Sequence, residues 1–290
     1  MGRTFGVQGA EFVWAVGLGL AVLPQGFRST VDLVPVYATV TTKTGTFATG
    51  LAKEDFTVLD NGVPQPIVSF AEAAQSISVF LMLDTSGRMA EARPRLFAAA
   101  REFLSHLKAD DRAMVGSLVY QGPPFTSDKN RLGTSLDLLP SDPGSPLWLA
   151  LDRAVTALAA ETSRRVIIVY TDGRNEDLGQ FRALRVSEAT LRERLEAAGT
   201  MLYAIGFEGR SLTTNIRALA RRSGGRATEL GRTDDLGRAL AGVADELHHQ
   251  YLLGFTPAVF DGKPHKLEVR LTRPDLLVRA RELYVARQKP

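Results

Sequence analysis

The region from about residue 76 to residue 250 alternates apolar runs with stretches of helical composition, and this alternation restricts the fold more than any other feature of the chain. The apolar runs lie at 77–83 (ISVFLML), 113–120, 165–171 (RVIIVYT), 201–207 (MLYAIGF) and 226–230. A strand without polar alternation is typical of a parallel sheet covered on both faces. Helices are predicted at 89–108, 146–161, 187–198, 212–222 and 233–249. We therefore expect an α/β fold with a doubly wound, mostly parallel sheet.

The two flanks of this region have β patterns instead. Residues 31–70 contain β-branched and aromatic runs, and Asn61-Gly62 between two of them is a strong hairpin signal. Alternating runs follow the last helix, at 251–256, 265–271 and 276–285. A length of 290 residues fits about two domains. We expect the α/β domain (76–250) to be inserted in a small β-sandwich-like domain formed by both chain ends (30–75 and 251–290).

The first 28 residues are interpreted as an export signal. Residues 12–23 (FVWAVGLGLAVL) are apolar, but the run is shorter than the roughly 20 residues of a transmembrane helix. Its length suits a secretory signal, whereas the adjoining Glu11 and the lack of a clean cleavage site argue against one. We expect a periplasmic or secreted protein, with a cytoplasmic location as the alternative. No later segment is expected to span a membrane.

Composition and missing motifs narrow the function. Cysteine is absent, which excludes disulfides, thiolate metal sites and thiol nucleophiles. The 35 Lys+Arg and 32 Asp+Glu leave a net charge of only +3, and the excess is scattered, so no nucleic-acid partner is expected. The chain has no G-x-S-x-G elbow, Walker loop or dinucleotide fingerprint. We therefore expect a protein that is not an enzyme.

Polar side chains follow two of the apolar strands. Asp84 and Ser86 come directly after the first, and Asp172 comes after the run at 165–171. The loop before the helix at 146–161 adds Ser145. The carboxyl ends of parallel strands share one edge of a sheet, and gathered oxygen atoms there suit Mg²⁺ or Mn²⁺. The same residues also have an ordinary interpretation, in which Asp84 or Ser86 caps a helix and Asp172 belongs to a turn. Spacing alone leaves both interpretations open.

Three segments resemble the motifs of the von Willebrand factor A domain. FLMLDTSGRM resembles its D-x-S-x-S motif after a buried strand, and VIIVYTDGRNE resembles the later strand that ends in Thr-Asp-Gly. GSPLWLALDRAV resembles the middle motif, in which a threonine precedes a helix. The flanking segments GLAKEDFTVLDNGVPQPIVSF and YLLGFTP…DGKPHKLEVRL resemble the bacterial VWFA-related domain of acidobacterial type. Together these likenesses cover nearly all of the chain after the N-terminal apolar run.

The resemblance implies a metal-ion-dependent adhesion site that binds Mg²⁺ or Mn²⁺, completed by a carboxylate from a protein partner. Its metal ligands would be Asp84, Ser86, Ser145 at the threonine position, and Asp172. Arg88 stands where the motif has its second serine, and a guanidinium cannot ligate a cation. If Arg88 points inward, its charge replaces the ion. If it points outward, a weakened metal site survives and Arg88 contacts the partner.

We therefore expect a non-enzymatic protein-binding or adhesion-type module with a degenerate metal-ion-dependent adhesion site. The first alternative is a structural scaffold whose vestigial, metal-free site is closed by Arg88. The second is a metal-dependent hydrolase of the phosphatase type, since an aspartate after an apolar strand can form an aspartyl-phosphate. That chemistry needs a second acid two residues on, where this chain has Ser86.

Overall fold

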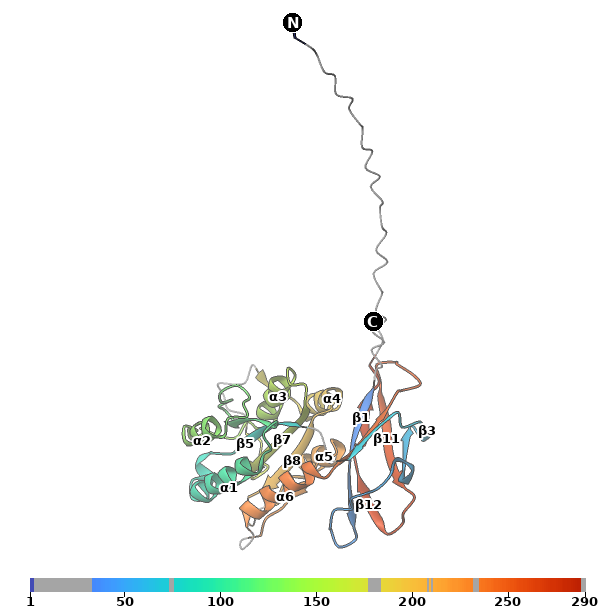
Figure 1. The fold of residues 1–290 in the computed structure, drawn as a ribbon. Helices are drawn as coiled ribbons and strands as arrows, with labels where there is room; N and C mark the ends of the chain where they lie inside the picture. Colours follow the sequence, from blue (N-terminus) through green and yellow to red (C-terminus); the bar gives the residue numbers. More distant parts are fainter. Residues whose placement is uncertain are drawn as a thin grey trace. The chain divides into compact units, whose positions relative to one another are not determined.

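The computed structural model describes residues 1–2, 33–72, 76–176, 184–207, 209, 211–231 and 235–287. The N-terminal apolar run lies outside these residues. Residues Asp32–Pro290 belong to one compact unit, which contains a parallel sheet with helices and two antiparallel sheets (Figure 1). Within the described residues, no helix has the length and apolar composition needed to cross a membrane.

The parallel sheet has five strands in the order β6-β5-β7-β8-β9. Their bounds are Ile77–Leu83 (β5), Arg112–Ser117 (β6), Arg164–Thr171 (β7), Met201–Gly206 (β8) and Ala227–Thr228 (β9). Every residue of β5 is buried, as expected for a strand covered on both faces. β6 lies on one side of β5, and the later strands of this sheet, β7, β8 and β9, lie on the other, so the winding reverses between β5 and β7. Ligands of doubly wound folds bind at this switch point, beyond the carboxyl ends of the strands.

Helices cover both faces of the parallel sheet (Figure 1). One face packs against α1 (Arg93–His106), α2 (Lys129–Asp137) and α6 (Leu236–His248). The other packs against α3 (Leu147–Leu158), α4 (Glu188–Ala198) and α5 (Thr214–Arg222). The sequence patterns predicted each of these helices except α2. That helix is short and contains Gly133, but Asp128 caps its first turn by accepting from the amides of Asn130 and Arg131.

The strands before and after this region form two four-stranded antiparallel sheets with a shared apolar core. One has the order β12-β1-β10-β4, with strands Leu276–Arg279, Val34–Thr42, Tyr251–Phe255 and Ser69–Glu72. The other has the order β13-β11-β2-β3, with strands Leu283–Val285, Pro264–Leu271, Phe56–Asp60 and Val63–Gln65. Both sheets therefore combine segments from the two ends of the chain, and the predicted fold class is confirmed. The domain boundaries at residues 75/76 and 250/251 stay a prediction.

Two local predictions in these sheets have different outcomes. Asn61 and Gly62 have φ angles of 48° and 83° and join β2 to β3, so the hairpin prediction is confirmed. The single strand predicted over 276–285 is wrong, because the segment divides into β12, which pairs with β1, and β13, which pairs with β11. Leu276 and Tyr284 fill the same core from opposite sheets. The apolar alternation therefore continues across the break and conceals it.

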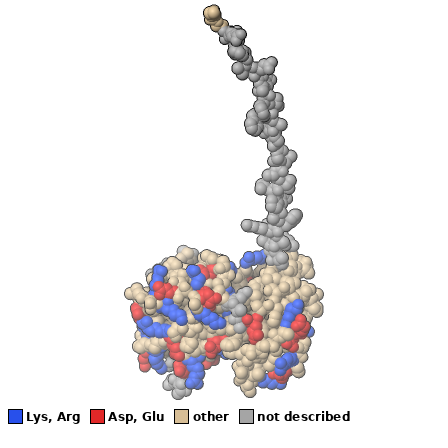
Figure 2. Space-filling model, in the orientation of Figure 1, with Lys and Arg blue, Asp and Glu red and all other residues tan. Residues whose placement is uncertain are grey.

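Charged side chains of both signs are interspersed over the face drawn in Figure 2. This face carries no broad patch of a single sign among the described residues, in keeping with the small net charge of the chain. The local clusters described below therefore depend on particular side chains and not on a general field.

Candidate functional site

Asp84 lies at the carboxyl end of β5 and is completely buried. Its Oδ1 accepts the amide N–H of Ser86 at 3.0 Å. Its Oδ2 accepts the hydroxyls of Ser145 and Thr171, each at 3.3 Å. Burial raises the pKa of the Asp84 carboxyl above its ordinary value, and the charges of Asp172 and Asp142 act in the same direction.

Asp172 lies at the carboxyl end of β7, and its side chain is only 1% exposed. Its Oδ1 accepts the amide N–H of Arg174 at 3.1 Å. Its Oδ2 accepts Nε–H of Arg88 at 3.1 Å, and Nε of Arg174 lies farther away, at 3.8 Å. The two acids at the switch point are therefore held differently: Asp84 by neutral donors, and Asp172 mainly by a guanidinium.

Arg88 belongs to the short 3-10 helix η2 (Gly87–Met89), and its side chain points into the site. Besides Asp172 it donates to Ser145 Oγ at 3.1 Å and forms an ion pair with Glu176. Burial by itself would lower the pKa of Arg88, but the hydrogen bond to Glu176 and the charge of Asp172 more than offset this, and the pKa is raised. The guanidinium therefore stays positive at every physiological pH.

The structure brings all of the sequence-predicted site residues to one edge of the sheet. Asp84, Ser145 and Asp172 are linked through the bonds described above, and Ser86 adjoins them. Ser86 is also buried, and its Oγ has no hydrogen-bond partner among the described residues. Ser86 precedes η2 without a hydrogen bond from its side chain to that helix, so the interpretation of this residue as a side-chain cap is wrong.

These residues, as they are arranged, do not fit a divalent ion. Of the four oxygen-bearing side chains that the resemblance assigns to the metal, Asp172 and Ser145 already bond to the Arg88 guanidinium. A guanidinium has only donors, so these two side chains bond to a positively charged group and are not free to ligate a metal ion.

Sequence reasoning missed two members of the site. Thr171 stands inside the Thr-Asp-Gly motif, yet its bond to Asp84 becomes visible only when β5 and β7 are paired. Glu176 lies four residues beyond Asp172, and its amide donates to the Ser145 carbonyl at 2.8 Å, which joins two loops of the site. No local pattern marks Glu176, because its partners come from distant parts of the chain.

A neighbouring loop supports the site. Asp142 is buried and accepts the Ser117 hydroxyl at 2.6 Å and the Leu118 amide at 3.1 Å. Its own amide donates to the Thr85 carbonyl at 3.2 Å. Asp142 therefore anchors the loop that contains Ser145 against the carboxyl ends of β5 and β6.

Comparison with known proteins identifies the fold. A scan against models of protein families finds no match, and a search of curated proteins finds none. Among solved structures, the chain is similar to proximal thread matrix protein 1 from the mussel byssus, solved with a zinc-occupied MIDAS motif, at 16% identity and a TM-score of 0.50. The match covers 63% of this chain and 48% of that one, so this chain spans about half the length of the mussel protein. The α/β part of the chain therefore has the fold of a von Willebrand factor A domain.

Two further solved structures have lower TM-scores. The von Willebrand factor domain of the type V pili tip protein Mfa5 from Porphyromonas gingivalis is 11% identical, with a TM-score of 0.47, over 59% of this chain and 94% of that one. The manganese-loaded TRAP protein of Plasmodium vivax is 13% identical, with a TM-score of 0.45, over 81% of this chain and 100% of that one.

Proposed function

We propose that this chain is a non-enzymatic protein-binding module of adhesion type, whose binding face is the sheet edge around Asp84, Arg88 and Asp172. The observation that carries the proposal is the position of Arg88, whose guanidinium bonds to Asp172 and Ser145 at the switch point of the sheet. In the von Willebrand factor A domains that this chain resembles, a metal ion at this position is coordinated by a carboxylate from the partner. Here the arginine supplies the positive charge itself.

The exposure of the side chains around Arg88 supports a partner with an acidic group. The Arg88 side chain is 28% exposed, whereas that of Glu176 is 42% exposed and lies on the outer side of the pair. A partner carboxylate that displaced Glu176 would gain a charge-assisted bond to a preorganised guanidinium, which Asp172 would continue to hold. Arg174 has a 60% exposed side chain beside Asp172 and adds positive charge at the rim. Recognition of this kind needs no metal.

The geometry of Asp84 argues against the phosphatase-type hydrolase. A nucleophilic carboxylate needs one oxygen that is open to substrate. Asp84 has zero exposure, and both of its oxygens accept hydrogen bonds. The structural scaffold remains the second candidate, because the same bonds of Arg88 would also close a vestigial site. We further propose that the protein is exported. The apolar run at 12–23 and the proposed adhesion-type role support this.

A site-specific cross-linking experiment tests the binding face. A photoreactive amino acid replaces Tyr120, which is 41% exposed in the loop after β6, at the same edge of the sheet as Asp84. The matched control carries it at Leu277, 54% exposed on β12. Both variants are irradiated in an extract of the producing organism. We expect one discrete protein adduct from position 120, none from 277, and persistence of the adduct in EDTA. Equal labelling at both positions, or no adduct, would favour the scaffold.

A metal titration separates the arginine-filled site from a working metal site. Calorimetry with Mg²⁺ and Mn²⁺ is run on the wild type, on Asp84→Ala, on Arg88→Ser, and on Arg88→Ser combined with Asp84→Ala. We expect no binding by the wild type at millimolar concentrations, binding by Arg88→Ser, and loss of that binding in the double variant. Wild-type binding that Asp84→Ala abolishes would contradict the proposed role of Arg88.

A further inference from the structure

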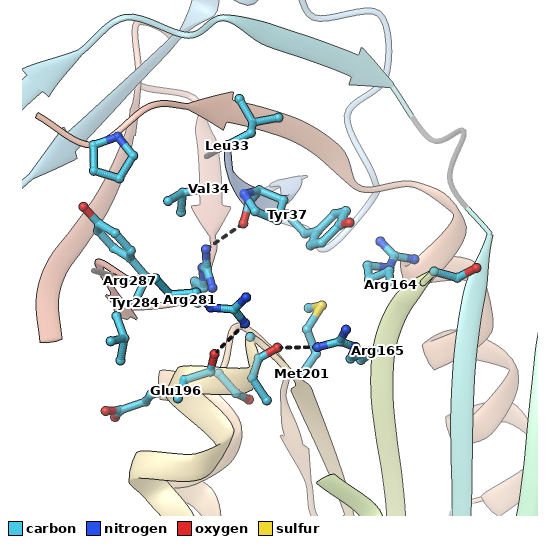
Figure 3. A pocket seen from close by; sticks show the side chains of 18 of the residues that line it. Leu33, Val34, Tyr37, Arg164, Arg165, Glu196, Met201, Arg281, Tyr284 and Arg287 are labelled. Atoms are coloured by element: carbon cyan, nitrogen blue, oxygen red, sulfur yellow. Dashed lines mark hydrogen bonds between the residues drawn. The ribbon is translucent and has the colours of Figure 1, made fainter. Parts of the chain in front are cut away.

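A cavity of about 320 Å³ lies at the amino-terminal ends of the parallel strands, opposite the carboxyl-terminal ends that carry the Asp84 site. It is bounded by the first residues of β7 and β8, the end of α4, the start of β1, and the segment from β12 to the end of β13. Figure 3 shows the basic side chains of Arg164, Arg165, Arg281 and Arg287 around this cavity, together with Tyr37 and Tyr284. Nothing in the proposed function uses it.

Within the described part of the chain, the arginines that line the cavity lack direct carboxylate partners. None of these four arginines forms an ion pair with a carboxylate among the described residues. They donate instead to carbonyl oxygens and to one amide, such as Pro35 O for Arg281 at 2.8 Å and Gln250 Oε1 for Arg164 at 2.6 Å. Glu196 also lines the cavity, but it pairs with Arg222 at 2.9 Å. The cavity therefore has an excess of positive charge.

Two of the guanidinium donors are buried without an acceptor. Nε of Arg164 and Nε of Arg281 each lack a hydrogen-bond partner among the described residues. Arg164 is only 6% exposed. Burial lowers the pKa of Arg164, although the charges of Asp111 and Glu246 act in the other direction, and burial lowers the pKa of Arg281 to about 10. A buried cation without a counter-ion is costly, and most buried N–H donors in native proteins are satisfied.

The rest of the wall is apolar and aromatic. The Arg164 guanidinium lies 4.9 Å from the Tyr37 ring centroid, and Arg281 lies 5.9 Å from that of Tyr284. The lining also includes Leu33, Met201 and Phe260. The volume is at the lower end of the range for small-molecule sites, which run from about 300 to 1,000 Å³. A ligand that fits this wall has a compact apolar body and one negatively charged head.

We propose that this cavity, called here the Arg164–Arg281 pocket, binds a small organic oxyanion, with a carboxylate or phosphate head toward the two arginines and an aromatic or branched apolar body against Tyr37 and Tyr284. The head supplies the negative charge that this arginine-rich wall lacks, and guanidinium groups bind carboxylate and phosphate oxygens with matched geometry. The pocket is independent of the Asp84 edge, since it uses the amino ends of the strands.

The test uses the full chain and four probes: benzoate, phenyl phosphate, inorganic phosphate, and the neutral analogue benzamide. Binding is measured by calorimetry and by thermal shift. We expect saturable binding of benzoate or phenyl phosphate at one site, weaker binding of inorganic phosphate, and none of benzamide. The better of the two aromatic anions identifies the head group. Equal binding of benzamide, or no binding of either aromatic anion, overturns the proposal.

Matched variants locate the binding. Arg281→Gln removes one of the guanidinium groups that line the pocket, and we expect a loss of affinity of about tenfold or more. Arg287→Gln changes an exposed residue of the same wall, so it should not impair folding. We expect it to lower the affinity about threefold. Arg217→Gln, on an exposed ion pair with Glu229 outside the pocket, is the control and should bind like the wild type. Unchanged affinity in both pocket variants would place the anion elsewhere and overturn the proposal.

Discussion

Nε of Arg88 lies 3.1 Å from Oδ2 of Asp172, across the point where the winding of the parallel sheet reverses. Arg88 comes from the segment after β5, and Asp172 comes from the end of β7, 84 residues later in the sequence. The pair thus joins the two central strands at the edge where this fold binds its ligands. It makes Arg88 both a stabilising residue and the defining feature of the candidate site.

Loss of the Arg88 charge should destabilise the protein. Arg88→Met removes the guanidinium that donates to Asp172, whose side chain is 1% exposed, and Arg174 Nε lies farther from that carboxylate, at 3.8 Å. We expect the free energy of unfolding in urea to fall by about 2 kcal/mol, below the usual cost for a fully buried pair because Arg88 is partly exposed. Arg174→Met is the control and should cost less than about 0.5 kcal/mol. Equal losses in the two variants would mean that Arg88 has no special role.

The pH dependence of stability should change in a defined direction in Asp84→Asn. Burial raises the pKa of Asp84 above its ordinary value of 3.8, so the folded state binds the proton more tightly than the unfolded state does. Its contribution to stability therefore decreases as pH rises from the unfolded pKa through the folded pKa. The stability of Asp84→Asn relative to wild type should increase between about pH 4 and pH 7, as measured by urea unfolding at each pH.

Asp111→Asn should show the opposite slope and serves as the counterpart. Burial by itself would raise the pKa of Asp111, but hydrogen bonds from His248 and from the amides of Ile77 and Lys108 more than offset this and lower it. The stabilisation is therefore complete above the unfolded pKa and is lost as pH falls through the folded pKa. Asp111→Asn should lose more stability at about pH 7 than at about pH 3. Parallel pH profiles for the two variants would contradict the opposite directions of these two pKa shifts.

Gly122→Ala should be much more harmful than an alanine at another left-handed glycine. Gly122 has a φ of +74°, and a Cβ there would lie 1.9 Å from the Val115 carbonyl oxygen of β6. Gly50 has a φ of +71° with no atom within 4 Å of such a Cβ, so it carries the same backbone strain without the clash. We expect a loss of about 1 kcal/mol for Gly50→Ala and above about 3 kcal/mol for Gly122→Ala. Thermal unfolding of the two variants gives the comparison.

Glu246 of α6 connects the parallel-sheet region with the antiparallel sheets. It is 2% exposed and accepts hydrogen bonds from Tyr203 at 2.5 Å, from Thr39 at 3.2 Å, and from Arg279. Glu246→Gln leaves the half-buried Arg279 without its carboxylate, and we expect a loss of about 2–4 kcal/mol. Glu268, which is half-exposed and pairs with Arg270, provides the control: Glu268→Gln should be nearly neutral. A loss for Glu246→Gln no larger than that of the control would show that this connection contributes little.

Much of the fold could be predicted because its signals are local. The β5 segment has no polar alternation and is buried throughout, as its composition indicates. Asn61-Gly62 takes the left-handed angles that a two-residue hairpin requires. Where local signals are weak the predictions fail, as for α2, which depends on the cap formed by Asp128, and for the break between β12 and β13.

The amino-acid sequence by itself determined which strands are buried, where the chain turns, and that Asp84 and Asp172 follow strands whose ends meet at one edge. Only the tertiary structure decided that Arg88 points toward Asp172, that Glu176 joins it, and that Arg164 and Arg281 face one cavity. The physical reason is distance along the chain. Strand burial and turns follow from neighbouring residues, whereas the direction of a long charged side chain follows from the charges and carbonyl oxygens that remote segments bring beside it.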